Sequence, residues 1–396
     1  MVRSPGIPRG VWMLGFVSLF MDVSSELIHS LLPVFMVVGL GATALMVGIV
    51  EGVAEATALI VRVFSGTISD WLGRRKGLTV LGYGLGAVSK PLFALALTVH
   101  WVFAARFLDR IGKGIRGAPR DALIADLTPP EIRGTAYGLR QSLDTVGAFV
   151  GPLLAIGLMV LWAGDFRAVF WFAVVPGVLS VLILVFGVRE PDASTARVRP
   201  ASPVHWGSLS EFSGAYWWVV VAGGVFTLAR FSEAFLILRV QQLGLAVSFA
   251  PLVLVVMNVV YAVSAYPFGR LADRMSHGKL LAAGLAVLIL ADIMLAQSRA
   301  LNLVWVGVAL WGLHMGMTQG LLAAMVAGAA PAHLRGTAFG FFNLVSGIAM
   351  LVASVVAGLL WDELGAPVTF YAGAGFSVLA LALLMLRRDL RFLTMR

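Results

Sequence analysis

Acidic residues inside two apolar stretches near the start of the chain are the residues best placed to do chemistry. Asp22, Glu26 and His29 recur at i, i+4 and i+7, so they share one face of a helix. Glu51 and Glu55 stand four residues apart in the next apolar stretch. Carboxylates packed together away from water resist ionisation, so one or more could carry a proton near neutral pH. A fixed ion-pair network that only holds the helices together is the alternative interpretation.

The same half of the chain supplies cations that could pair with these acids. The segment 100–123 is unusually rich in charged residues for an apolar helix. An ionised side chain near the bilayer centre costs about 2.5–3.5 kcal/mol by insertion scales, so these side chains must face protein, water or the cytoplasmic end. The expected partners, with one further acid, are Arg62, Lys90, Arg106, Arg110, Arg140 and Asp144.

The second half of the chain has fewer internal charges. Asn258 lies 203 residues after Glu55, so a carboxylate in one half corresponds to an amide in the other. Arg239 and Asp292 are internal charges of this half to which we assign no role. The asymmetry predicts proton binding in the first half and substrate contacts from both. The candidate residues of the second half are Arg230, Glu233, Asn258, Tyr261, His314, Gln319 and Asn343.

Long apolar helices must position these residues. Of the 396 residues, 60% are hydrophobic and 12% are charged, whereas soluble domains carry about 25% charged residues. The apolar runs are continuous, which excludes the alternating pattern of a membrane β-barrel. The sequence has no cysteine, which excludes disulfides and thiolate metal sites. A spanning helix needs about 20 residues, so we predict an all-α polytopic membrane protein with about a dozen spans.

The distribution of basic residues predicts the topology. A formal net charge of +9 could by itself suggest a nucleic-acid partner. However, the Lys and Arg residues cluster in alternate loops, and the loops near 38–44 and 97–101 contain none. This is the positive-inside pattern of a protein with both termini in the cytoplasm and an even number of spans. We therefore expect a multi-pass protein of the inner (cytoplasmic) membrane that has the lipid bilayer, and no nucleic acid, as a partner.

Two motifs recur at nearly the same offset. The sequence RGTAYG at 133–138 returns as RGTAFG at 335–340, 202 residues later, and GTISD at 66–70 returns as GRLAD at 269–273, 203 residues later. A shared offset indicates a duplicated bundle of helices. We predict a six-helix bundle over 1–188, a cytoplasmic linker over 189–212 and a second six-helix bundle over 213–396. The expected spans are 11–38, 44–69, 77–98, 100–123, 132–161, 166–188, 213–240, 246–271, 278–299, 301–327, 335–361 and 367–387.

Three motifs resemble those of the major facilitator superfamily. The loop after the second span resembles its cytoplasmic signature, and the second half carries a degenerate copy. The segment Gly147-x-x-x-Gly151-Pro152 resembles a motif of the family's exporters, mostly antiporters. One departure is Arg110, where the family pattern usually has glycine. The signature and its copy comprise Gly66, Asp70, Gly73, Arg74, Arg75, Gly269, Asp273 and Arg274.

The resemblance implies two pseudo-symmetric six-helix bundles, twelve helices in all, with a substrate cavity between them. Asp70 would act as a latch that is broken when the bundles rock. We predict a proton-coupled exporter, an antiporter, that moves a small molecule by alternating access as a monomer, without a cofactor. No metalloprotease, hydrolase or phosphate-loop motif is present, so we do not expect an enzyme. The alternatives are export of a divalent metal cation bound by Asp22, Glu26 and His29, and proton-coupled import.

Overall fold

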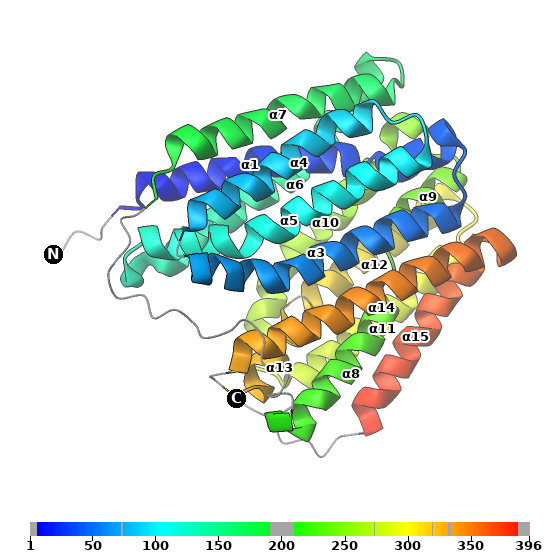
Figure 1. The fold of residues 1–396 in the computed structure, drawn as a ribbon. Helices are drawn as coiled ribbons and strands as arrows, with labels where there is room; N and C mark the ends of the chain where they lie inside the picture. Colours follow the sequence, from blue (N-terminus) through cyan, green and yellow to red (C-terminus); the bar gives the residue numbers. More distant parts are fainter. Residues whose placement is uncertain are drawn as a thin grey trace. The chain divides into compact units, whose positions relative to one another are not determined.

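The computed structural model describes residues 6–72, 74–190, 210–272, 274–318, 320–331 and 334–386. Throughout these ranges the regular structure is helical and contains no strand, which confirms the predicted all-α fold (Figure 1). Nine helical segments in the described ranges are long and apolar enough to cross a membrane. Helices occupy the other three predicted ranges too, but these are shorter or less apolar. The number of spans and the side of the termini stay predictions.

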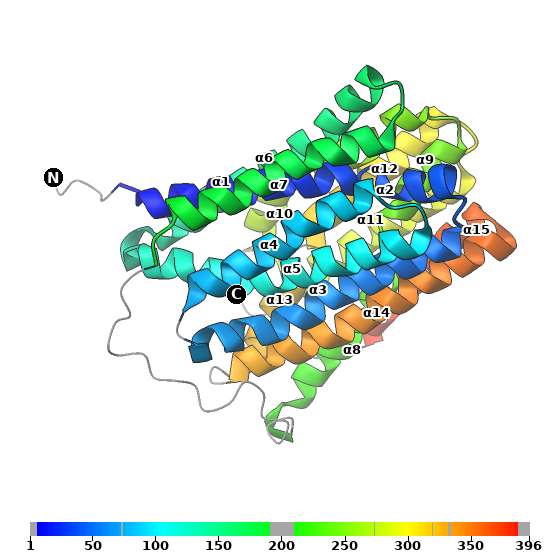
Figure 2. The same ribbon diagram turned by 45° about the horizontal axis from the view of Figure 1, so that its top comes forward.

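The chain divides into two compact units, and the first comprises 1–32 and 57–203. Within it, α1 packs against α6 and α7, and α4 packs against α5 and α7 (Figure 2). The elements of this unit are α1 (Arg9–His29), the later part of α3 (Ala44–Leu72), α4 (Arg75–Ala94), α5 (Val99–Leu127), η2 (Pro130–Ile132), α6 (Arg133–Leu161) and α7 (Phe166–Gly187).

The second unit comprises 33–56 and 204–396, so it includes a segment that the sequence analysis assigns to the first bundle. Within it, α10 and α11 pack against α12, and α15 packs against α11 and α14. The elements are α2 (Leu32–Val34), η1 (Phe35–Gly39), the start of α3, α8 (Gly214–Leu228), α9 (Ala234–Gln242), η4 (Val247–Phe249), α10 (Leu252–Ala272), α11 (His277–Gln297), α12 (Leu301–Thr318), α13 (Leu321–Ala329), α14 (Arg335–Leu364) and α15 (Ala366–Leu386).

Two of the predicted spans in the second unit are interrupted. The helix expected over 213–240 is broken between α8 and α9, and the one expected over 301–327 is broken between α12 and α13. Gly320 has a φ of 88° at the second break, a conformation that favours glycine. At the first break, the N–H of Ser232 donates to Ser354 Oγ at 3.2 Å, and the N–H of Ala234 donates to Ser232 Oγ at 3.2 Å. These serine hydroxyls satisfy backbone groups that the broken helix leaves open.

Glycines let the start of α3 touch α14 backbone to backbone. A Cβ added at Gly48 would lie 2.2 Å from the carbonyl oxygen of Ser354. A Cβ added at Gly358 would lie 2.6 Å from the carbonyl oxygen of Ala44. No side chain fits at such distances, so this helix pair depends on glycine, as is common where membrane helices pack closely.

We expect Gly48→Ala to destabilise the protein by about 1–3 kcal/mol, because the new methyl group must push α3 away from α14. The measurement is thermal unfolding of the purified protein in detergent. Gly84→Ala is the matched control, since no atom lies within 4 Å of a Cβ at that position of α4. Equal melting temperatures for the two variants would contradict the packing described here.

Candidate functional site

In the first unit, the two acids of α1 lie where α6 comes closest. A Cβ added at Gly147 would be 2.9 Å from the Cβ of Asp22, and one added at Gly151 would be 2.9 Å from the Cβ of Glu26. Any larger residue would force α6 away from α1 at these points. Pro152, also buried, follows directly within α6. The structure therefore joins two predictions that the sequence leaves separate, the acidic face of α1 and the glycine motif of α6.

The two acids have different surroundings. Glu26 Oε2 lies 3.3 Å from Nδ1 of His29, one turn later on the same helix. Asp22 makes no ion pair within the described ranges, and the strongest charges acting on it are those of Asp144 and Arg116. Asp144 itself pairs with Arg140, four residues earlier on α6. Of the two acids of α1, Asp22 is thus the one without a direct ion-pair partner among the described residues.

A second cluster of charges surrounds Asp109 on α5. Lys90 Nζ of α4 donates to Asp109 Oδ1 at 2.7 Å and to Ser25 Oγ at 2.9 Å. Arg106 Nη1 and Arg110 Nε each lie 4.0 Å from Asp109 Oδ2. These four charged side chains are all at most 4% exposed. Arg106 and Arg110, which the sequence analysis offers as partners for the acids of α1, have Asp109 as a partner.

Sequence reasoning therefore missed Asp109 as a site residue, although a signal was present. Asp109 follows Arg106 by three residues, so both lie on one helix face. It also directly precedes Arg110, the residue at which this chain departs from the family pattern. What the spacing could not reveal is Lys90, because that contact joins two different helices.

Two arginines of α5 extend the polar region along α1 and α4. Arg120 Nη1 donates to Ser18 Oγ at 3.0 Å, and Arg120 Nη2 lies 3.0 Å from Asp121 Oδ1. Arg116 is 5% exposed and stacks over the ring of Tyr83, with its Cζ 4.8 Å from the ring centroid. A buried guanidinium over an aromatic face gains electrostatic stabilisation without an ion pair.

In the second unit, the candidates gather around the break between α8 and α9. Arg230 lies in the break, and its Cζ is 5.8 Å from the ring centroid of Phe226. The Arg230 guanidinium has electrostatic interactions with Glu233 and Tyr261. His314 of α12 is fully buried, and its Nδ1 lies 2.8 Å from the carbonyl oxygen of Gly284.

The remaining candidates of this unit are spread over several helices. Asn258 of α10 and Asn343 of α14 are half-buried. Glu51 is fully buried and Glu55 is half-buried, both in the part of α3 that belongs to this unit. Gln319 lies outside the described residues. The predicted clustering of the acids of α3 with those of α1 stays a prediction.

The described residues contain no group of three or more His, Asp or Glu side chains that could hold a metal ion. Of the predicted metal ligands, Glu26 and His29 touch each other, and Asp22 stands one turn away along α1. The structure thus provides a pair rather than a three-ligand site in this region.

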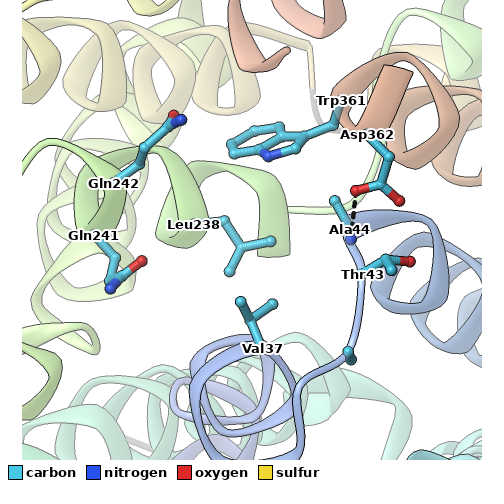
Figure 3. Close-up of a pocket in the computed structure, with 9 residues that line it drawn as sticks. Val37, Thr43, Ala44, Leu238, Gln241, Gln242, Trp361 and Asp362 are labelled. Carbon is cyan, nitrogen blue, oxygen red and sulfur yellow. Dashed lines mark hydrogen bonds between the residues drawn. The ribbon is translucent and has the colours of Figure 1, made fainter. Parts of the chain in front are cut away.

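A small pocket in the second unit lies at the start of α3 (Figure 3). Its volume is about 290 Å³, and Gln241, Gln242 and Trp361 are among its lining residues. Asp362 at its edge accepts the N–H of Ala44 at 3.0 Å and that of Leu45 at 2.8 Å. A carboxylate at a helix N-terminus stabilises the helix. None of the predicted site residues lines this pocket, and Asp362 has a structural role there.

The family model described as Major Facilitator Superfamily matches residues 14–353 and 234–392 of this chain. The chain belongs to the major facilitator superfamily. It is 30% identical over 387 residues to an uncharacterized MFS-type transporter of Methanocaldococcus jannaschii. The aligned region covers 96% of this chain and 95% of the relative. It is 26% identical to the multidrug resistance protein MdtH of Salmonella typhi, over 88% of this chain and 84% of that protein.

Solved structures show the same major facilitator fold. A crystal structure of a mutant of the nucleoside transporter NupG superimposes on this chain with a TM-score of 0.81 and 12% sequence identity. The superposition covers 96% of this chain and 100% of the NupG chain. At that identity, the similarity concerns the fold alone. Membership of the family makes this chain a multi-pass membrane transporter of a small molecule and not an enzyme.

The major facilitator signature after α3 is tied to neighbouring helices of the first unit. A Cβ added at Gly66 would be 3.3 Å from the Cβ of Ala118, so α3 and α5 approach closely there. Arg75 Nε lies 2.8 Å from Asp126 Oδ2, and Glu190 accepts the N–H of Arg75. Arg75 therefore pairs with an acid of α5, Asp126. Sequence reasoning gave neither acid a part in this motif.

The other residues of the signature are less informative. Arg74 is exposed, and Gly73 and Asp273 lie outside the described residues, as does the side chain of Asp70. Gly269 has no atom within 4 Å of a Cβ position, and the N–H of Arg274 donates to Leu271 O at 3.0 Å. The latch function of Asp70 stays a prediction.

We expect Asp109→Asn to destabilise the purified transporter by about 3–5 kcal/mol, because it leaves buried cations without their carboxylate. Lys90→Met should lower the free energy of unfolding less in the Asp109→Asn variant than in the parent. In the Asp109→Asn variant the lysine has already lost its carboxylate partner. A double-mutant cycle by thermal or denaturant unfolding measures this coupling. If the loss of unfolding free energy in the double variant equals the sum of the losses in the two single variants to within about 0.5 kcal/mol, the pair is not coupled.

Proposed function

We propose that this transporter is a proton-coupled exporter of a small molecule that works by alternating access. The observation that supports this most is the contact of Asp22 and Glu26 with Gly147 and Gly151. An acid at so close a helix contact has few ways to adjust when its charge changes. Protonation therefore alters the packing of α1 on α6 rather than only the local solvation.

Protonation has a defined electrostatic effect at each acid. A neutral Glu26 loses its attraction to a protonated His29, and a neutral Asp22 loses its repulsion from Asp144 and its attraction to Arg116. Each change shifts the balance between two conformations that hold α1 and α6 differently. A gradient of one pH unit supplies about 1.4 kcal/mol per proton, enough to change such a balance about tenfold.

The substrate in this proposal is a small organic molecule. Its binding residues come from both halves, with Arg230, Tyr261 and His314 contributing from the second. The similarity to MdtH, which is described as a multidrug resistance protein, supports export over import. The transporter would act as a monomer in the cytoplasmic membrane, with the proton gradient as its only energy source and no cofactor.

Proteoliposomes with an imposed pH gradient test this function. An antiporter accumulates its substrate in an acidic lumen, because protons leave as the compound enters. We expect such accumulation for at least one member of a panel of organic cations, neutral compounds, organic anions and divalent metal ions. Accumulation in an alkaline lumen instead would identify a proton-coupled importer, and accumulation of a metal ion alone would identify a metal transporter. Transport that ignores the gradient would exclude proton coupling.

We expect Asp22→Asn and Glu26→Gln to reduce gradient-driven accumulation at least tenfold, because neither variant side chain can lose a proton. Exchange of labelled against unlabelled compound without a gradient should persist. The matched control is Glu363→Gln, which removes an exposed acid at the end of α14. Full gradient-driven transport by both variants of α1 would place the coupling acid elsewhere.

A further inference from the structure

Asp292 of α11 is a buried acid that the proposed function does not use. Its exposed fraction is 0%, and neither oxygen of its carboxyl group has a hydrogen-bond partner among the described residues. Buried polar atoms of this kind are rare in native proteins and need an explanation. An isolated, ionised carboxylate in apolar surroundings would cost far more than the whole stability of the protein, so such a group takes up a proton instead.

The carboxyl group of Asp292 and a residue of the break between α8 and α9 approach the same point of α15. A Cβ added at Gly373 of α15 would be 2.8 Å from Asp292 Oδ2 and 2.9 Å from Cε1 of Phe231. The carboxyl group, the glycine and the ring therefore meet at one point. Phe231 belongs to the non-helical segment 229–233, directly after Arg230. The ring of Phe231 and the carboxyl group of Asp292 are therefore neighbours at the surface of α15.

The ring of Phe231, near Asp292, packs against other aromatic rings. The centroid of the Phe231 ring lies 5.4 Å from that of Trp311, and 5.5 Å from those of Phe235 and Phe370. Phe231 is 4% exposed and Asp292 is 0% exposed, so both side chains are buried in this conformation. Movement of the break is therefore the event that would admit water to Asp292.

No charged group of the described elements around Asp292 pairs with it, and this includes Arg230 and Glu233 of the break. The helix α15 has no Asp, Glu, Lys, Arg or His between its ends, and α13 has none either. The titratable group of α12 is His314, which faces Gly284. The cation of α9 is Arg239, which donates to the carbonyl oxygens of Leu295, Ala296 and Ser298 at the end of α11. On α11 itself, His277 and Lys279 lie at the opposite end.

Other buried polar atoms in this part of the second unit also lack a partner among the described residues. They belong to α12 and α15, the two helices that pack on α11. Buried donors and acceptors without partners are expected where a water molecule or a proton is bound in one conformation and absent in another. The atoms are Trp311 Nε1, His314 Nε2 and Ser377 Oγ.

We propose that Asp292 is a second proton-binding site, neutral in this conformation and ionised when the α8–α9 break moves Phe231 away. The proton is carried on one carboxyl oxygen and passes to water that enters beside the displaced ring, so no other reactant is required. Because Arg230 precedes Phe231 in the break, substrate contact at Arg230 and proton release at Asp292 involve the same backbone segment. This inference rests on the proposed proton coupling and adds a site for it in the second unit.

Infrared spectroscopy of the full-length purified transporter tests the proton site without any substrate. We expect the C=O stretching band of a protonated carboxyl group at neutral pH, and its loss in Asp292→Asn. Asp362→Asn is the matched control, because the carboxyl group of Asp362 accepts backbone N–H groups and needs no proton. Spectra that are identical for the parent and Asp292→Asn in this region would overturn the proposal.

Phe231→Ala tests the neighbouring ring and remains informative if Asp292→Asn fails to fold. Removing the ring admits water, so we expect the protonated-carboxyl band to weaken at neutral pH and to return on acidification. A band that persists unchanged across this pH range in Phe231→Ala would contradict gating by the break. These outcomes do not depend on transport. If the band behaves as expected but the parent ignores a pH gradient in proteoliposomes, the proposed function fails and the proton site stands.

Discussion

The cost of placing a charge among apolar helices governs this molecule. Lys90 and Asp109 meet this cost by pairing at 2.7 Å, with two arginines close by. Arg116 meets it by lying over the ring of Tyr83. Asp292 has no such partner among the described residues, which leaves protonation as its way of avoiding an isolated charge. Each solution constrains which helices lie side by side, because the partner usually comes from a different helix.

Glycine provides the second constraint, since it determines how near two helices can come. Gly147 and Gly151 bring α6 against α1 at its two acids, and Gly373 leaves room for the carboxyl group of Asp292. In each case an acid lies at a contact that a methyl group would disrupt. A change of charge at such a contact acts on helix packing directly. This relation between glycine and acid occurs in both units, although the sequences around it differ.

The two units divide the charged residues as the sequence indicates, but the structure places several of those in the second unit at a break in a helix. The first unit contains the dense ion-pair clusters, as its charged α5 suggests. The second unit has fewer charges, but they lie at a broken helix, where the backbone is also held by Ser232 and Ser354. The break coincides with Arg230, Ser232 and Glu233, polar residues that interrupt the apolar sequence of 213–240. Phe231, which follows Arg230 in the break, lies near Asp292 at Gly373 of α15.

The sequence by itself determined the all-α membrane fold, the family and most of the helix ranges, but not the breaks within 213–240 and 301–327. These follow from local properties: continuous apolar runs, the distribution of arginine and lysine, and motifs read within a few residues of one another. Even within the site, pairs along one helix such as Glu26 and His29 were predictable from spacing. Only the tertiary structure decided that Lys90 meets Asp109, that Gly147 faces Asp22 and that Phe231 lies near Asp292. These contacts join residues that are 19 to 125 positions apart. Spacing along one helix carries no information about which face meets another helix.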